Sequence, residues 1–255
     1  MFGVRDEGPV RWLTIDNPQR RNAIPFGGWA RLAEAIDEFA ASPARVLVLT
    51  GAGEDFCSGA DVGGDMIERT AAGAYAAMAE VSAAAAALHR TPKPTVAAVD
   101  GVAVGAGMNL ALGCDIVIAS ERARFSEIFV KRGLTLDFGG TWLLPRLAGM
   151  ARAKELALTG RLFGADEALE YGLVTAVVPP EDLAAVAAEK AAELAAGAPL
   201  AQRFIKEGLD RAFEMSFGEA LSYEQRAQTI LFTSEDLAEG VSAFVEKRPP
   251  EFKGR

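Results

Sequence analysis

The chain has 255 residues, half of them hydrophobic, which is enough to bury one large core or a core with an appendage. Its formal net charge of -9 argues against a broad surface for nucleic acid or an anionic membrane, but still allows a local basic pocket for a phosphorylated ligand. Two cysteines without paired spacing and a single histidine, His89, indicate neither a disulfide framework nor a zinc site, and they disfavour a Ser-His-Asp hydrolase. The N-terminus lacks the charged segment and apolar core of a signal peptide, so we expect a cytoplasmic protein without a metal.

The first half of the chain alternates strand-like and helix-like patterns. The strand patterns cover residues 10–15, 46–49, 95–99 and 115–118, and the helical patterns cover 29–39, 71–88 and 107–112. The alanine-rich stretch at 71–88 is interrupted by Glu80 and Ser82, which makes it a poor membrane span. Strands that alternate with helices predict an α/β core.

The second half of the chain is mainly helical. The expected helices cover residues 142–147, 151–158, 165–171, 181–196, 199–214, 218–232 and 235–247. A strand-like run at 174–178 interrupts them, and we expect the last four helices to form a terminal set without partners in the sheet. We therefore divide the chain into an α/β core at 1–197 and a helical region at 198–255.

Two glycine-rich segments carry the strongest functional signal. Residues 56–61 (FCSGAD) and 101–109 (GVAVGAGMN) each follow a strand-like run, so both should leave the same sheet. Small residues leave backbone N–H groups uncovered, and two such groups converging on one carbonyl oxygen would form an oxyanion hole. The alternative is a pair of ordinary strand-to-helix turns. Neither segment is a nucleotide motif, because Leu110 follows where a dinucleotide fingerprint needs a third glycine.

The two segments together resemble the crotonase, or enoyl-CoA hydratase/isomerase, superfamily. Further matching segments lie at residues 17–18, 21–23, 139–141, 158–160, 171–174 and 239–248, so that the resemblance covers nearly the whole chain. The resemblance implies a right-handed spiral of β-β-α units with a C-terminal helical trimerisation region, and hence a homotrimer or a dimer of trimers. It also places the oxyanion donors on the N–H groups of Ala60 and Ala106. Coenzyme A (CoA) would arrive with the acyl substrate, and no other cofactor is implied.

The resemblance further assigns residues to the CoA part of the substrate. They are Arg20, Arg21, Ala60, Asp61 and Val62, with Phe244 and Lys247 supplied by a neighbouring subunit. A solvated turn at Arg20 and Arg21, and a helix-terminal charge pair at Lys247 and Arg248, are the simpler alternatives.

The positions of the two catalytic glutamates of the family's hydratases read Asn109 and Phe129 in this chain. An amide can orient water but cannot accept its proton at neutral pH, and a phenyl ring can do neither. Glu127 lies two residues before Phe129 and could reach the site only if the backbone shifted, so we expect it to be a surface or salt-bridged carboxylate.

Asp137 lies where other branches of the family place a catalytic carboxylate. The stretch 133–146 around it looks like that of the ring-epoxide phenylacetyl-CoA isomerases. The alternative is that Asp137 only caps the helix that follows. The helix N-terminus would lower the pKa of Asp137, whereas apolar neighbours would raise it. Leu134, Phe138 and Trp142 suggest an apolar acyl pocket, although their spacing also fits a buried helix stripe.

A single carboxylate is suited to isomerisation, because it can remove a proton from an unsaturated acyl-CoA and return that proton to another carbon. We therefore favour an isomerase-type acyl-CoA enzyme with Asp137 as its base. An enoyl-CoA hydratase is the first alternative, and a non-catalytic acyl-CoA-binding protein is the second.

Overall fold

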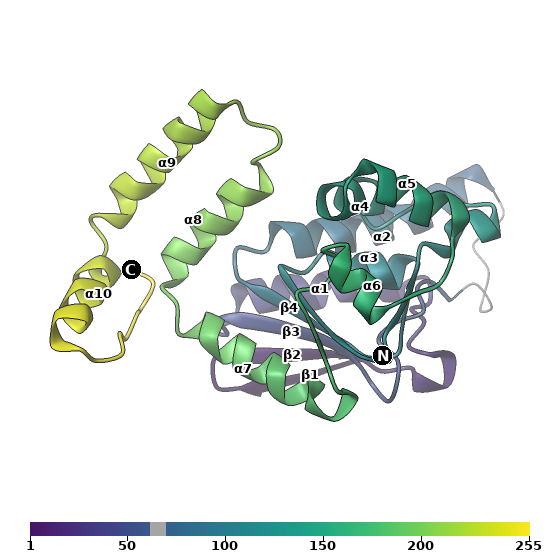
Figure 1. Ribbon diagram of the computed structural model, residues 1–255, viewed down its shortest axis with the longest axis horizontal. Coiled ribbons are helices and arrows are strands. Elements are labelled where there is room, and N and C mark those ends of the chain that lie inside the picture. Colours follow the sequence, from purple (N-terminus) through teal and green to yellow (C-terminus); the bar gives the residue numbers. More distant parts are fainter. Residues whose placement is uncertain (62–69) are drawn as a thin grey trace.

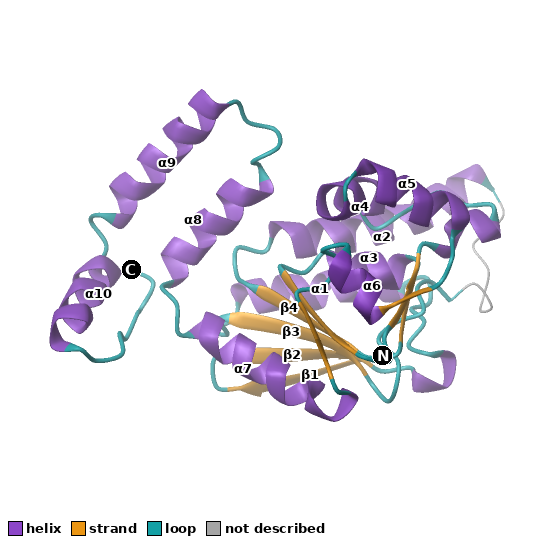
Figure 2. Cartoon of the chain, viewed as in Figure 1, coloured by secondary structure: helices purple, strands orange, loops and turns teal. Residues whose placement is uncertain are grey.

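The computed structural model describes residues 1–61 and 70–255, and its centre is a twisted, mostly parallel sheet (Figures 1 and 2). The strand order is β1-β2-β3-β4-β6-β9, with β1 antiparallel to β2 and every other pair parallel. The strands are β1 Phe2–Glu7, β2 Val10–Ile15, β3 Val46–Gly51, β4 Thr95–Val99, β6 Ile116–Ser120 and β9 Ala176–Val178. The four strand patterns of the first half are confirmed, whereas β1 lacks a clear signal because five of its six residues are exposed.

A second, three-stranded sheet has the order β5-β7-β8. Its strands are β5 Val102–Val104, β7 Arg124–Ser126 and β8 Phe163–Gly164. β5 lies inside the segment that the sequence presented as one glycine-rich loop, and it pairs in parallel with β7. This pairing, between strands of only three residues each, fixes the direction of the chain where the second glycine-rich segment leads into the next helix.

Helices cover both faces of the main sheet. One face is covered by α1 Gly28–Ala41, α2 Ala71–Arg90 and α3 Ala106–Leu112, and the other by α7 Leu183–Ala195. The alternation of side chains along β3 shows the division, because Leu47 and Leu49 pack with the first group and Val46 and Val48 pack with α7. The parallel strands are therefore buried on both faces, as their unbroken apolar runs require.

The position of α7 corrects one expectation. The sequence placed the helix at 181–196 in a terminal set without sheet partners, but its alanines at 187, 191 and 195 are buried against β2, β3, β4 and β6. Alanines every four residues form a flat stripe, which lets the helix backbone approach the sheet closely.

The other helices of the core connect these layers. They are η1 Pro18–Arg20, η2 Ile128–Arg132, α4 Gly140–Ala148, α5 Met150–Thr159, α6 Ala165–Glu170 and η3 Pro180–Asp182. Helix α4 packs against α3 and α5, so the segment that precedes α4 is held near the start of α3. The chain around residue 137 therefore lies beside the second glycine-rich segment.

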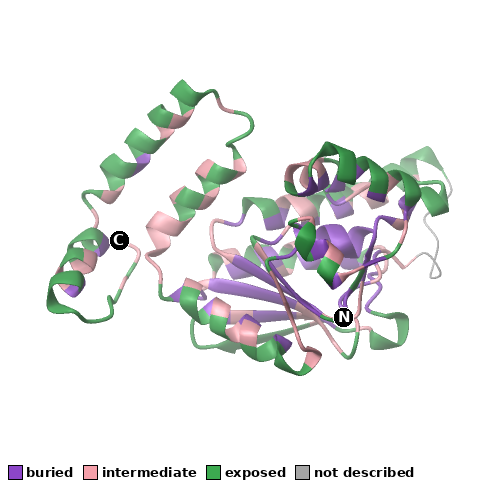
Figure 3. Ribbon diagram, in the orientation of Figure 1, coloured by how far each residue is buried: buried purple, intermediate pink, exposed green. Residues whose placement is uncertain are grey.

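The last three helices extend away from the core (Figure 1). They are α8 Pro199–Asp210, α9 Phe217–Leu231 and α10 Glu235–Glu246. The surface of these helices and of the turns between them is mostly exposed (Figure 3), and it includes large apolar side chains such as Phe213, Phe217, Phe232 and Phe244, which are 71–85% exposed. Apolar area of this extent on one part of a chain is typical of a protein interface.

Helix α2 is the one helix among the described residues with the length and apolar composition of a membrane span. It packs along α1, and Val81, Ala84, Ala87 and Leu88 are buried in the core that both helices share. The core helix of a soluble protein passes the same test, so its composition is weak support for a membrane location.

Candidate active site

The first glycine-rich segment leaves β3 and is held on both sides by backbone hydrogen bonds. On one side, Ser58 N donates to Arg21 O (2.9 Å) and Asp61 N donates to Ile24 O (2.8 Å). On the other side, Cys57 N donates to Val102 O of β5 (2.9 Å). The segment is therefore clamped between the turn after β2 and the second glycine-rich segment.

The N–H of Ala60 points away from the turn at residue 24. Both hydrogen bonds that join this part of the segment to Ile24 use the neighbours of Ala60, namely the carbonyl of Gly59 and the N–H of Asp61. Successive backbone groups of an extended chain point to opposite sides, so the Ala60 N–H is directed toward the second segment. No acceptor for it is found in residues 1–61 and 70–255.

Ala106 supplies the second N–H, because it is the first residue of α3 and has no acceptor within the helix. The turn into the helix is made by Gly105, whose φ of 58° is unfavourable for residues with a side chain, whereas Ala106 itself is not among the positive-φ residues. The alanine at 106 therefore costs no backbone strain.

The two segments touch so closely that glycine is required at two positions. A Cβ atom at Gly59 would lie 2.8 Å from Val104 O, and one at Gly107 would lie 2.1 Å from Cys57 O. Bare backbone of the first segment therefore packs against bare backbone of the second, next to Ala60 and Ala106. An oxyanion hole would need the N–H groups of these two residues to converge on one oxygen atom.

Asn109 lies one helical turn after Ala106 and is fully buried. Its Nδ2 donates to the backbone carbonyl of Asp137 (3.0 Å) and, more weakly, to Oε2 of Glu127 (3.4 Å). Its Oδ1 is buried and has no donor among the described residues. Phe129 is buried with its ring beside Gly105. Neither position offers a carboxylate, so the two residues cannot act as the glutamate pair of a hydratase.

Asp137 precedes α4 without capping it, which answers the alternative raised by the sequence. The N-cap of α4 is Gly139, and its first turn receives no side-chain hydrogen bond. Phe138 and Gly139, which separate Asp137 from the helix, both have positive φ values, 48° and 82°. Oδ1 of Asp137 is buried without a partner among the residues described, and burial raises the pKa of Asp137 to about 6.

Glu127 corrects the expectation of a surface or salt-bridged carboxylate. It is fully buried at the end of β7, and its Oε1 has no hydrogen-bond partner within the part of the chain that the structure describes. Burial raises the pKa of Glu127 to about 8, opposed by the Asn109 amide and reinforced by the charge of Asp137. The sequence prediction did not include the strand at Arg124-Phe125-Ser126. Its pairing with β5 places residue 127 beside Gly105.

The residues of the core that are predicted to bind CoA lie next to the first glycine-rich segment or at its end. Arg20 Nη2 donates to Asp61 Oδ1 (2.6 Å), which ties the turn at η1 to the end of the segment. The Arg21 side chain is mostly exposed, and its backbone carbonyl holds Ser58. Val62 lies outside the described residues. Arg20 and Asp61 thus form an ion pair.

The three apolar residues suggested for an acyl pocket do not gather in one place. Phe138 is buried and packs on Trp29 with ring centroids 5.5 Å apart, because its left-handed backbone turns the ring into the core. Trp142 instead contacts His89 and the guanidinium of Arg146. Leu134 is 59% exposed. Of the three, only Phe138 adjoins Asp137.

Phe244 and Lys247 lie at the end of α10, which is at the opposite end of the molecule from α3 in Figure 1. The Phe244 side chain is 85% exposed. Neither residue can reach the two glycine-rich segments of its own chain, so a role in the same site requires a second copy.

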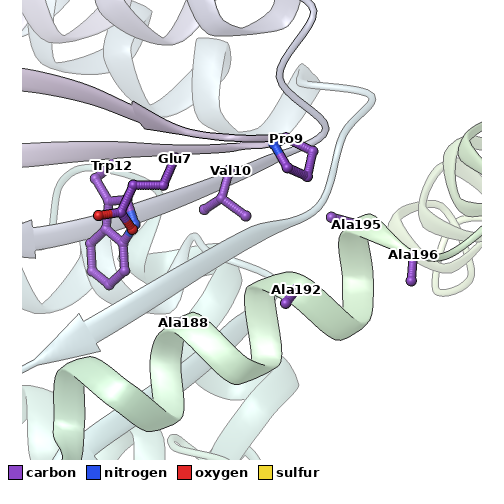
Figure 4. Close-up of a pocket in the computed structure, with 8 residues that line it drawn as sticks. All are labelled: Glu7, Pro9, Val10, Trp12, Ala188, Ala192, Ala195 and Ala196. Atoms are coloured by element: carbon purple, nitrogen blue, oxygen red, sulfur yellow. The ribbon is translucent and has the colours of Figure 1, made fainter.

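A separate hollow of about 410 Å³ lies between the β1–β2 hairpin and α7 (Figure 4). Its walls are Pro9, Val10 and Trp12 on the sheet side and small alanines on the helix side, with Glu7 at the rim. It holds none of the predicted site residues and lies on the α7 face of the sheet. Among the described residues, no group of three or more His, Cys, Asp or Glu side chains is placed to hold a metal ion.

Comparison with known proteins identifies the family of the chain. The family model of enoyl-CoA hydratase/isomerase matches residues 5–255. The chain therefore belongs to the enoyl-CoA hydratase/isomerase family, and its fold is the crotonase fold.

Individual relatives differ in their reactions. A 1,2-epoxyphenylacetyl-CoA isomerase of Escherichia coli (strain K12) is 40% identical over 253 residues, covering 98% of this chain and 97% of the relative. A short-chain-enoyl-CoA hydratase of Clostridium acetobutylicum is 38% identical over 255 residues, covering 99% and 97%. The crystal structure of an enoyl-CoA hydratase from Bacillus anthracis has a TM-score of 0.95 at 33% identity, covering 100% of this chain and 99% of that one. The family is thus clear, whereas the relatives include both isomerases and hydratases.

Proposed function

We propose that the protein is an acyl-CoA isomerase in which Asp137 is the base and the N–H groups of Ala60 and Ala106 form the oxyanion hole. The observation that carries the proposal is the buried, unpartnered Oδ1 of Asp137 beside two segments with uncommitted N–H groups. At the two hydratase positions stand Asn109 and Phe129, which cannot take a proton from water.

In the proposed reaction, the thioester oxygen accepts hydrogen bonds from Ala60 N and Ala106 N. The Asp137 carboxylate then takes a proton from an acidic carbon of the acyl group, and the electrons of that C–H bond form an enolate. Each donor can stabilise the developing charge by roughly 3 kcal/mol. A proton returned to a different carbon completes the shift of the double bond. Since the pKa of Asp137 is about 6, the base is largely ionised at neutral pH.

We further propose that the enzyme assembles as a trimer or a dimer of trimers. The exposed apolar surface of α8, α9 and α10 supports this, as does the distance of Phe244 and Lys247 from the site of their own chain. In such an assembly the two residues would complete a neighbour's CoA site, together with Arg20, Arg21 and Asp61 of that neighbour. Binding would exchange part of the Arg20–Asp61 ion pair for contact with the CoA phosphates.

The test compares wild type with Asp137→Asn in D₂O. Proton exchange at the α- or γ-carbon of an unsaturated acyl-CoA should fall about 10²- to 10⁴-fold, the usual cost of losing a general base. Calorimetry should show nearly unchanged acyl-CoA affinity, and wild type should bind acyl-CoA much more tightly than free CoA. Asp37→Asn, an exposed carboxylate on α1, serves as the matched control.

Two other outcomes would point to the alternatives. Efficient hydration of a simple 2-enoyl-CoA by wild type would favour a hydratase, the activity named for one relative at 38% identity. Tight acyl-CoA binding without exchange, isomerisation or hydration would indicate a binding protein.

A further inference from the structure

Glu127 lies at the site without belonging to either glutamate position of the family's hydratases. In the parallel pairing of β5 with β7, Val104 stands opposite Ser126, and Gly105 N donates to Ser126 O (2.8 Å). Glu127 therefore leaves β7 directly beside the turn that presents the Ala106 N–H. The cost of burying a carboxyl group with one oxygen unpartnered is high, so an apolar residue would be the more stable choice at a purely structural position.

Glu127 and Asp137 flank the same amide. Nδ2 of Asn109 donates to Glu127 Oε2 and to the Asp137 backbone carbonyl, so one buried amide nitrogen holds both acidic residues at the same place. One oxygen of each of the three side chains is buried and without a partner among the described residues: Oε1 of Glu127, Oδ1 of Asn109 and Oδ1 of Asp137. Two interacting carboxyl groups in such a place hold one proton between them.

Burial favours Glu127 over Asp137 as the carboxyl group that holds the proton of the pair. Glu127 is fully buried, whereas Asp137 is partly exposed, and the charged form is disfavoured most where burial is deepest. Within the described residues, no cation forms an ion pair with Glu127 that would favour its ionised form. The resting site thus offers one acid and one base beside Asn109.

We propose that Glu127 is the proton donor of the isomerisation, acting together with the base Asp137. This inference rests on the proposed function. Asp137 takes a proton from one carbon, so that a C–H bond breaks and an O–H bond forms on Asp137. The Glu127 carboxyl group gives its proton to the other carbon, so that its O–H bond breaks and a new C–H bond forms. The pair still holds one proton after turnover, and its transfer from Asp137 to Glu127 restores the resting state.

The pair predicts a bell-shaped pH profile. Activity requires ionised Asp137 and protonated Glu127, so it should decline as the pH falls through about 6 and as it rises through about 8. A site with Asp137 as its single titrating group would lack the alkaline decline.

The experiment uses Glu127→Gln. Glutamine has the size of glutamate and is uncharged like the protonated carboxyl group, but it has no carboxyl proton to donate. Isomerisation should fall about 10²- to 10⁴-fold, while exchange of the proton removed by Asp137 persists in D₂O. The alkaline limb should disappear from the pH profile of the residual activity. Glu127→Asp should recover part of the isomerisation, and Glu121→Gln, an exposed glutamate between β6 and β7, should match wild type.

Each contrary result has a separate meaning. Wild-type isomerisation rates in Glu127→Gln, or an alkaline limb that survives the substitution, would overturn the role of Glu127 and leave the proposed function intact. Loss of exchange in Glu127→Gln with normal exchange in Asp137→Asn would make Glu127 the base and overturn the assignment of Asp137. A wild type that neither exchanges nor isomerises any acyl-CoA would overturn the proposed function itself.

Discussion

The contact between the two glycine-rich segments can be tested with Gly107→Ala. A Cβ atom at position 107 would lie 2.1 Å from the carbonyl oxygen of Cys57, and real contacts of this kind are at least 3.0 Å. The segments must therefore separate by about 1 Å, and a displacement of this size can cost about 10²-fold in rate. Because the obstacle is backbone rather than a flexible side chain, the overpacking should also lower the free energy of unfolding by about 1–3 kcal/mol.

The assay combines proton exchange of an acyl-CoA in D₂O with unfolding in urea. Gly3→Ala is the control, because position 3 is exposed on β1 and its new Cβ would meet Thr14 at an ordinary 3.8 Å. The control should exchange normally and be as stable as wild type or slightly more stable, since glycine weakens a strand. Gly107→Ala with wild-type exchange and stability would show that the close contact does not position the N–H groups.

Two further predictions concern stability and assembly. Burial raises the pKa values of Glu127 and Asp137, so from about pH 4 up to each folded pKa the native state holds a proton that the unfolded chain has lost. The free energy of unfolding should be greatest at the acid end of this window and fall as the pH rises through about 6 and 8, by up to about 1.4 kcal/mol per pH unit for each group. Urea unfolding of Glu127→Gln should show a weaker dependence of this free energy on pH between pH 6 and 8. An unchanged dependence would contradict the pKa assignment. Light scattering should report a trimer or hexamer at micromolar concentration, and removal of residues after Ser234 should weaken both assembly and acyl-CoA binding; a monomeric wild type would exclude the shared CoA site.

Much of the fold follows from local patterns in the sequence. The apolar runs at 46–49 and 95–99 are long enough to identify strands, and helical spacing identifies α1, because these signals depend only on neighbouring residues. The glycines at 59 and 107 also stand out in the sequence, since bare backbone must pass close to bare backbone there. Together with the further motifs, these features are sufficient to place the chain in its family.

The tertiary structure decided which acidic residues belong to the site. Glu127 reaches it because β7 pairs with β5, and a pairing between two three-residue strands leaves almost no periodic signal in the sequence. Asp137 is freed from capping α4 by positive φ values at Phe138 and Gly139, of which the first is unusual for a bulky residue. In the same way, α7 covers the sheet although its own residues do not indicate which surface they bury. Local composition fixes the elements, whereas the raised pKa values of Glu127 and Asp137 arise from burial between segments that are distant in the chain.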